Sequence, residues 1–216
     1  MPTSEPAPPC YDGRVSSTAI SALQRTIRTV FLDRDGVINR KLPEGFYVTR
    51  WDEFELLPGV AAAVTRFNRA GLLVVVVSNQ RGVARGRCTM ANIDTIHAAL
   101  QDRLAGSGAH IDGFFICPHE KGQCDCRKPL PGLFHQAVAR FPQIDAAASV
   151  MIGDSLSDIE FGHNLGMATI CVSSNTEHPS PGVQQAATLA NLSVSSLPEA
   201  VDALLGGDEG AESAKP

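Results

Sequence analysis

Residues 72–77 constrain the fold of this chain more than any other stretch. They read Leu-Leu-Val-Val-Val-Val and contain no polar side chain. A near-continuous apolar run of this length is typical of a strand in a parallel sheet that is covered on both faces. The run therefore predicts a layered protein in which parallel strands lie between helices.

Further strands and helices alternate along the sequence. Strands are expected at residues 29–32, 72–77, 114–116, 150–152 and 168–172. Between them, Val60, Val64 and Phe67 recur at helical spacing, Thr89 can cap a second helix, and a third is expected from about 131 to 141. Ser155 and Asp158 fit the cap of a fourth helix and its third-position acid, a weak helix follows Pro181, and the last is expected near 198–205. This order predicts an α/β fold, a Rossmann-like parallel sheet with right-handed crossovers and helices on both faces.

Length and composition fit one folded domain with two tails. The chain has 216 residues, of which 44% are apolar and 19% charged. We expect one folded domain at residues 27–205, with disordered tails at 1–26 and at 206–216. A short helix is expected near 19–25 within the first tail. The net charge of -5 argues against sequence-independent nucleic-acid binding, which needs a basic face.

No targeting or membrane segment is expected. No apolar run approaches the roughly 20 residues that span a bilayer, and the first nine residues lack a basic segment followed by an apolar one. We expect a cytoplasmic monomer that acts on a small molecule, without a nucleic-acid or membrane partner.

Polar residues gather where the predicted strands end. Asp33 and Asp35 follow the first strand, and Ser78 and Asn79 follow the second. Lys128 lies in the loop after the third strand, and Asp154 directly follows the fourth. Because ligands bind beyond the carboxyl ends of the strands in such sheets, we expect these side chains to share one site.

Their chemistry suits phosphoryl transfer. Asp33 can attack phosphorus as a carboxylate, and Asp35 can protonate the leaving alkoxide and then deprotonate water. Mg²⁺ prefers oxygen ligands, which Asp33 and Asp154 supply. The Lys128 ammonium and the Ser78 hydroxyl can hold phosphoryl oxygens. Each feature also has a purely structural interpretation. Asp-Gly and Ser-Asn are common in turns, and Asp154 could only stabilise a helix N-terminus.

The loop after the third strand predicts a structural zinc site. Cys117, His119, Cys124 and Cys126 follow the pattern C-x-H-x4-C-x-C. Three thiolates and one imidazole make a closed tetrahedral Zn²⁺ set. A disulfide is the rival interpretation, which a reducing cytoplasm disfavours. The metal would stiffen a short polar loop that runs directly into Arg127 and Lys128.

The strand-end motifs resemble the four signatures of the haloacid dehalogenase (HAD) superfamily of phosphohydrolases. The resemblance rests on Asp33-Arg34-Asp35-Gly36, Ser78, Lys128 and the stretch 153–158, and it runs from about residue 29 to 172. It implies a phosphoaspartyl mechanism with Mg²⁺, in which Asp33 is the nucleophile and Asp35 is both acid/base and a backbone metal ligand. The gaps between the motifs leave no room for an inserted domain, so we expect a capless member with an open site.

Within that superfamily the chain resembles the D-glycero-D-manno-heptose-1,7-bisphosphate 7-phosphatase family. The resemblance rests on Asp-Arg-Asp-Gly-Val-Ile-Asn, Ser-Asn-Gln-Arg-Gly-Val-Ala-Arg-Gly, the zinc loop and Cys-Arg-Lys-Pro. It implies removal of the sugar's 7-phosphate on the way to nucleotide-activated heptose. The substrate-binding residues it implies are Gly45, Tyr47, Ser78, Asn79, Gln80, Arg81, Arg127 and Lys128. Two departures are Ser78, where the family often has Thr, and Ser155, where it often has Lys.

Two alternatives stay open at this point. Histidinol-phosphate phosphatase shares nearly all of these motifs. Arg81, Arg85 and Arg127 could neutralise the second phosphate of a bisphosphate, which favours the heptose substrate, although Arg85 could equally be a solvated surface cation. The other alternative is a non-catalytic, zinc-stabilised binding module, which the intact acids disfavour. The choice between the α and β anomers of the sugar is open.

Overall fold

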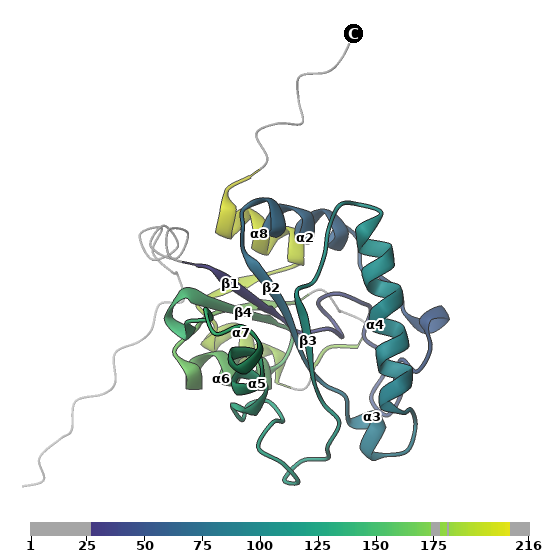
Figure 1. Ribbon diagram of the computed structural model, residues 1–216. Coiled ribbons are helices and arrows are strands. Elements are labelled where there is room, and N and C mark those ends of the chain that lie inside the picture. Colours follow the sequence, from purple (N-terminus) through teal and green to yellow (C-terminus); the bar gives the residue numbers. More distant parts are fainter. Residues whose placement is uncertain (1–26, 174–177, 181, 208–216) are drawn as a thin grey trace, which may run out of the picture.

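The structure is a computed structural model, and it describes residues 27–173, 178–180 and 182–207 (Figure 1). The strands are β1 (Thr29–Leu32), β2 (Leu73–Asn79), β3 (Gly113–Cys117), β4 (Ser149–Gly153), β5 (Ala168–Val172) and β6 (Leu192–Val194). The α-helices are α2 (Val60–Arg69), α3 (Arg81–Ala84), α4 (Met90–Ala105), α5 (Gly132–Arg140), α6 (Leu156–Leu165), α7 (Val183–Leu189) and α8 (Leu197–Leu205). Two 3-10 turns lie at η1 (Trp51–Glu53) and η2 (Ala146–Ala148).

The described strands form one parallel sheet in the order β3-β2-β1-β4-β5-β6. Strand β1 lies in the middle, with Leu32 opposite Val76 of β2 on one side and Ile152 of β4 on the other. The last residues of β1, β2 and β4 therefore reach the same edge of the sheet. This register places Asp33, Ser78 and Asp154 side by side, although they are far apart in the sequence.

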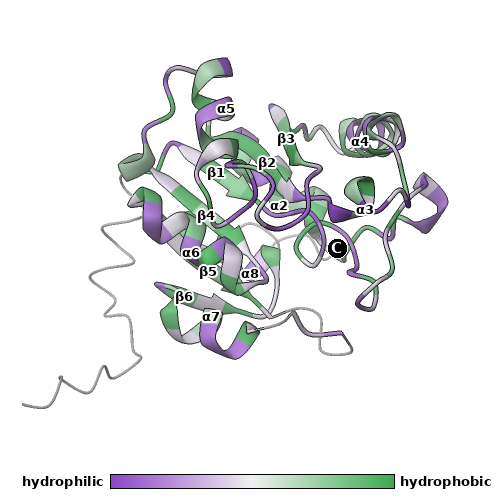
Figure 2. Ribbon diagram, turned by 90° about the horizontal axis from the view of Figure 1, so that it is seen from below, coloured by the Kyte–Doolittle hydropathy of each residue, from purple (hydrophilic) through white to green (hydrophobic). Residues whose placement is uncertain are grey.

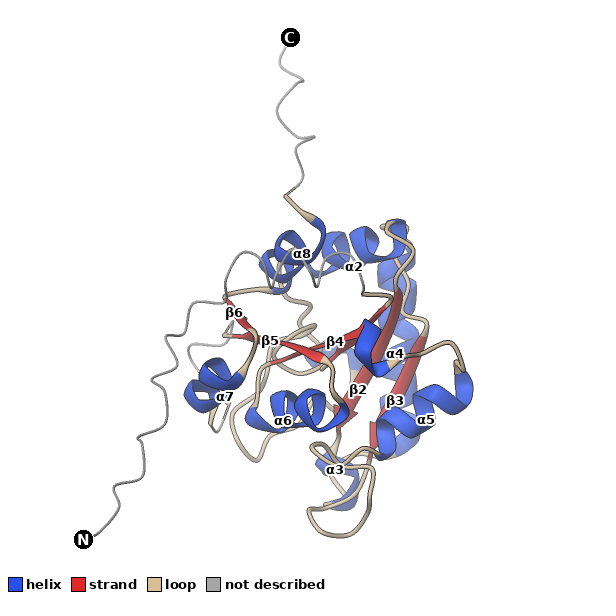
Figure 3. Ribbon diagram, turned by 90° about the vertical axis from the view of Figure 1, so that its left-hand side faces the viewer, coloured by secondary structure: helices blue, strands red, loops and turns tan. Residues whose placement is uncertain are grey.

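Helices cover both faces of the sheet (Figure 3). On one face α2, α4 and α8 pack over alternate strand residues such as Val30, Val74 and Val76, all fully buried. On the other face α5 and α6 pack over the intervening residues, among them Phe31 and Val75. The alternation of side chains along a strand explains why both sets are apolar. In Figure 2 the middle of the sheet is accordingly coloured mostly hydrophobic.

Short polar side chains start helices α4 and α6. The Thr89 hydroxyl accepts a hydrogen bond from the Asn92 backbone N–H, while the Asn92 side chain accepts one from the Thr89 N–H. Ser155 and Asp158 form the corresponding capping box at the start of α6. Each box satisfies N–H groups that have no partner inside the helix, so both helices begin at the residues that the sequence predicts.

The predicted α/β fold is confirmed, with differences at its margins. Strands β3 and β4 extend one residue beyond the predicted bounds at each end, and β2 begins one residue later and ends two residues later than predicted. The short strand β6 and the helical turn α3 were not predicted, because three and four residues are too few for a periodicity to register. The described chain from Thr29 to Leu205 contains no inserted cap domain. The predicted tails at 1–26 and 206–216, and the helix near 19–25, lie outside the described residues, except for Gly206 and Gly207.

Candidate active site

A cavity of about 1010 Å³ lies at the carboxyl edge of the sheet. The residues predicted to act in catalysis or substrate binding all line it: Asp33, Asp35, Gly45, Tyr47, Ser78, Asn79, Gln80, Arg81, Arg127 and Lys128. They come from the end of β2, the residues directly after it and the loops after β1 and β3, which the parallel register brings together. Asp154 lies just beneath, only 3% exposed. The fold thus brings the predicted site residues to one place.

Asp33 follows β1 at the floor of the cavity and is buried. Its carboxylate lies 3.0 Å from the Lys128 ammonium. Burial and the nearby carboxylates of Asp158 and Asp154 raise the pKa of Asp33 to about 7, although Lys128 opposes the rise. A carboxylate in this setting is poorly solvated and carries excess negative charge, so it is a strong nucleophile once a cation offsets that charge.

Lys128 is fixed in three directions. Its ammonium, buried with the rest of the side chain, donates to the Val77 carbonyl at 2.6 Å and pairs with Asp33 at 3.0 Å and Asp158 at 2.6 Å. Burial alone would lower the pKa of Lys128, but the two carboxylates raise it, so the side chain stays charged. Asn79 holds the Lys128 backbone with two hydrogen bonds, one to its N–H and one to its carbonyl. The lysine is therefore positioned in advance of any substrate.

Asp35 is held by a cluster of donors. The fully buried Arg34 guanidinium donates to both of its oxygens at 2.9 and 3.0 Å, and the side-chain amides of Asn39 and Gln80 donate at 2.9 and 2.7 Å. Burial would raise the pKa of Asp35, but the Arg34 charge and these hydrogen bonds outweigh it and lower the pKa. Gln80 also donates to the Ser78 hydroxyl at 3.0 Å, so the amide that bonds Asp35 connects the loop after β1 with the end of β2.

Three carboxylates gather beside the cavity. The side chains of Asp33, Asp154 and Asp158 offer oxygens that lie within 4.8 Å of one another. Burial raises the pKa of Asp154, and Asp158 adds to the rise. Gly36 has φ +96°, and a Cβ there would lie 2.1 Å from an Asp154 oxygen, so only glycine lets the β1 loop approach this closely. Buried, mutually repelling carboxylates are the donor set that a divalent cation such as Mg²⁺ suits.

The predicted zinc ligands form a second cluster. Cys117, His119, Cys124 and Cys126 offer ligand atoms that all lie within 4.8 Å of one another. The Cys117 and Cys124 sulfurs are 3.6 Å apart, and the His119 Nδ1 lies 3.4 Å from the Cys126 sulfur. Ligand atoms on a tetrahedron with Zn–S bonds of about 2.3 Å are separated by roughly 3.8 Å. The cluster therefore has the size of a closed zinc site, and the cysteines are not paired as disulfides.

The three arginines expected near a second phosphate are not equivalent. Arg81 and Arg127 line the cavity, whereas Arg85 does not line it and pairs with Glu120 at 2.9 Å. Arg81 lies 3.7 Å from Glu120 and 4.0 Å from Glu44. The Arg127 guanidinium donates to the His119 carbonyl at 3.2 Å, which ties it to the zinc cluster. Arg85 therefore acts as a surface ion-pair partner in this structure.

Three residues of the site were missed from the sequence. Asp158 was read only as a helix cap, yet it also pairs with Lys128. Lys41 pairs with Asp154 at 3.0 Å. Arg34 belongs to the Asp33–Gly36 motif, which predicts no role for its side chain, yet its guanidinium holds Asp35. A buried charge cannot be recognised from sequence alone, but the i, i+4 spacing of Asp154 and Asp158 at a helix start was an available signal.

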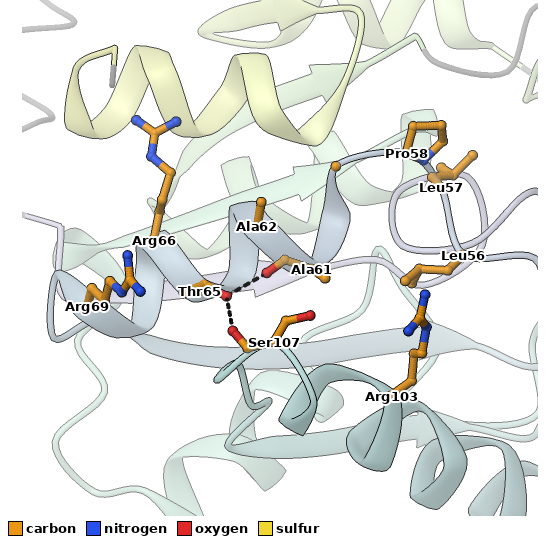
Figure 4. Close-up of a pocket in the computed structure, with 11 residues that line it drawn as sticks. Leu56, Leu57, Pro58, Ala61, Ala62, Thr65, Arg66, Arg69, Arg103 and Ser107 are labelled. Carbon is orange, nitrogen blue, oxygen red and sulfur yellow. Dashed lines mark hydrogen bonds between the residues drawn. The ribbon is translucent and has the colours of Figure 1, made fainter. Parts of the chain in front are cut away.

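A second hollow of about 640 Å³ lies between α2 and α4, away from these groups (Figure 4). Its charged residues are Arg66, Arg69 and Arg103, which extend in different directions (Figure 4). Arg66 pairs with Asp202 of α8. The Thr65 hydroxyl donates to the carbonyls of Ala61 and Ser107. Nothing in this hollow converges on a ligand, so the cavity at the sheet edge is the candidate active site.

Comparison with known proteins agrees with this geometry. Residues 125–200 match the family model described as HAD-hydrolase-like. The chain is 46% identical over 140 residues to the D-glycero-alpha-D-manno-heptose-1,7-bisphosphate 7-phosphatase of Mycobacterium tuberculosis, covering 64% of this chain and 73% of that protein. It is 35% identical over 187 residues to the D-glycero-beta-D-manno-heptose-1,7-bisphosphate 7-phosphatase of Escherichia coli, covering 83% of this chain and 96% of that protein.

A solved structure is similar over the same range. It is the D,D-heptose 1,7-bisphosphate phosphatase from B. bronchiseptica complexed with magnesium and phosphate, with a TM-score of 0.73 and 33% identity. The match covers 83% of this chain and 98% of that one. Among the described residues no helix is both long enough and apolar enough to cross a bilayer.

Proposed function

Because the chain belongs to the D-glycero-D-manno-heptose-1,7-bisphosphate 7-phosphatase family of HAD-like phosphoric monoester hydrolases, we propose that it removes the 7-phosphate of heptose 1,7-bisphosphate and leaves heptose 1-phosphate. The observation that carries the proposal is the convergence of Asp33, Asp35, Lys128 and Asp154 on one edge of the sheet. We further propose that the product supplies the synthesis of nucleotide-activated heptose.

In the proposed reaction the Asp33 carboxylate attacks the phosphorus of the 7-phosphate. The P–O bond to the sugar breaks, and Asp33 becomes an aspartyl phosphate. Lys128 is already charged and fixed 3.0 Å from Asp33, so it can hold a phosphoryl oxygen without reorganising. The Ser78 hydroxyl, positioned by Gln80, can donate to another phosphoryl oxygen. Water then attacks the aspartyl phosphate, releases inorganic phosphate and restores Asp33.

Asp35 has the proton-transfer role in both halves of this reaction. The donors around it favour the carboxylate, which is the form that takes a proton from the attacking water. In the first half it must instead give a proton to the leaving alkoxide. An arriving phosphate dianion raises the pKa of a neighbouring carboxyl by repulsion, so substrate binding itself favours the protonated form that this step requires.

Mg²⁺ would be held by the carboxylates of Asp33 and Asp154 and by the backbone carbonyl of Asp35, with Asp158 close behind. When bound, Mg²⁺ neutralises charge on the phosphoryl group and on the acids that surround it. Burial raises the pKa of Asp33 and of Asp154, and repulsion from the neighbouring acids adds to the rise; a bound cation would offset this repulsion. We propose Zn²⁺ at Cys117, His119, Cys124 and Cys126, where it stabilises the loop that carries Arg127.

Cations at the wall of the cavity are proposed to bind the 1-phosphate. Arg81 at the start of α3 and Lys121 and Arg127 in the loop after β3 all line it. A bisphosphate brings a second dianion that these side chains can neutralise, whereas the imidazole of histidinol phosphate gains nothing from them. Gly45 and Tyr47 line the same cavity from the loop after β1 and complete the proposed sugar site.

The proposal is tested by measuring kcat/KM for phosphate release side by side with three substrates. These are the two anomers of heptose 1,7-bisphosphate and histidinol phosphate. We propose a preference for the α anomer, supported by the higher identity to the relative named for it. The Asp33→Asn variant is the control and should lose hydrolysis of every phosphate ester. A higher kcat/KM for histidinol phosphate would refute the heptose substrate, and unchanged hydrolysis by Asp33→Asn would refute the mechanism.

The physiological setting is part of the proposal. We propose a cytoplasmic monomer whose only partner is its small sugar-phosphate substrate, with no nucleic-acid or membrane partner. The net charge of -5 supports the absence of nucleic acid. Light scattering on the purified protein tests the oligomeric state, and a mass of twice 22.9 kDa would contradict the monomer.

A further inference from the structure

Lys41 reaches the candidate metal site from the loop after β1. Its ammonium lies 3.0 and 3.4 Å from the two Asp154 oxygens and also donates to the Ser180 hydroxyl. Ser180 in turn donates to an Asp154 oxygen at 2.5 Å. One of the three gathered carboxylates is therefore covered by an ammonium and a hydroxyl from elsewhere in the chain.

The two lysines of the site form ion pairs with different carboxylates. Lys128 pairs with Asp33 and Asp158, and Lys41 pairs with Asp154. Lys128 is also bonded to the Val77 carbonyl, and its side chain is 1% exposed. The Lys41 side chain is 27% exposed and lines the cavity. Lys128 is fixed, whereas Lys41 has a long flexible stem at an open wall and can change partner.

Lys41 and a divalent cation compete for the same carboxylate. Two cations at one carboxylate repel each other at close range. The divalent cation is attracted more strongly to the carboxylate, so it displaces the ammonium. The Lys41 ammonium that is displaced from Asp154 stays at the cavity wall, where it can bind another anion. The nearest anion that catalysis brings into this cavity is the phosphoryl group of the substrate.

We propose that Lys41 is a substrate-binding residue whose ammonium covers Asp154 before Mg²⁺ binds and transfers to the substrate's phosphoryl oxygens afterwards. The transfer couples the binding of Mg²⁺ to the binding of phosphate. Mg²⁺ displaces the Lys41 ammonium from Asp154, and the ammonium then pairs with the phosphate. Metal binding thus prepares the cavity for an anion, and phosphate in turn favours metal by keeping Lys41 away from Asp154. The inference rests on the proposed phosphatase function, but its test does not need turnover.

The test compares Lys41→Met with Arg40→Met by calorimetry. Arg40 is the neighbouring cation on the same loop, pairs with the exposed Glu55 and does not line the cavity. Mg²⁺ should bind Lys41→Met about fivefold more tightly than the wild type, as expected for loss of one competing part-buried ion pair. At saturating Mg²⁺, inorganic phosphate should bind Lys41→Met at least about fivefold more weakly. Arg40→Met should match the wild type in both titrations.

Each outcome decides the proposal. Unchanged or weaker Mg²⁺ binding by Lys41→Met would overturn the competition, and unchanged phosphate binding would overturn the transfer. Lys41→Arg keeps the charge and should restore most of the phosphate affinity, which a purely structural role for the side chain would not produce. If both shifts occur in a protein that hydrolyses no heptose bisphosphate, the inference stands and the proposed substrate falls.

Discussion

His97 provides a prediction whose size follows from the structure. It lies on α4, 6% exposed, with its ring stacked on Phe114 at 4.2 Å between centroids. Its Nε2 has no hydrogen-bond partner among the described residues. Burial and, to a smaller extent, the nearby Arg34 charge lower the pKa of His97 from 6.5 to about 3. The folded protein therefore keeps this histidine neutral at pH values where the unfolded chain protonates it.

The pKa difference makes stability depend on pH. Below pH 6.5 the unfolded chain binds a proton at His97 that the folded protein does not, so the free energy of unfolding falls as the pH falls. The loss continues until about pH 3, where the folded protein also binds the proton. At about pH 5, roughly 1.5 pH units below the ordinary value, the loss is about 2 kcal/mol, at 1.36 kcal/mol per unit.

Urea unfolding of the wild type and of His97→Phe, at about pH 7.5 and about pH 5, measures this loss. Phenylalanine keeps the stacked ring and removes the buried nitrogen that lacks a partner, so the two proteins should agree within about 1 kcal/mol at the higher pH. On acidification the variant should lose about 2 kcal/mol less than the wild type. The zinc cluster and the acids of the active site titrate in both proteins and cancel in this comparison.

An exposed histidine supplies the control. His135 lies on α5 at the surface, so His135→Phe should lose as much stability on acidification as the wild type. Equal losses in the wild type and His97→Phe would refute the reasoning, because they would mean that water reaches His97 in the folded protein.

Three further predictions concern the site. Gly36→Ala should abolish Mg²⁺ binding in calorimetry, because its Cβ would lie 2.1 Å from an Asp154 oxygen at φ +96°, and wild-type affinity would contradict this. Lys128→Met should lower the free energy of unfolding, measured in urea, by about 3–5 kcal/mol, because it leaves the buried carboxylates of Asp33 and Asp158 without their partner. The same variant should stop phosphate release. A loss below about 1 kcal/mol would show that water solvates these carboxylates. Removing metal from Cys117, His119, Cys124 and Cys126 with a chelator should lower the Tm, and elemental analysis should find one zinc per chain, whereas an unchanged Tm would argue against a structural metal.

Much of the fold could be predicted because its signals are local. The apolar run at 72–77 predicts β2, and the helix starts at Thr89 and Ser155 follow from capping side chains a few residues away. The motif spacing excluded a cap domain, and the zinc loop carries all four candidate ligands within ten residues. The short β6 gave no such signal, since its place at the sheet edge depends on pairing with β5.

The sequence alone determined the α/β layering, the strand ends where chemistry had to lie and the residue types available there. Only the tertiary structure decided which charges meet. Asp158 is a helix cap by sequence and a partner of Lys128 in space, Arg85 is a candidate phosphate ligand by sequence and a surface ion pair in space, and Lys41 lies 113 residues from the Asp154 that it covers. The physical reason is range: capping and periodicity act over a few residues, whereas an ion pair depends on how burial and strand register bring distant loops together.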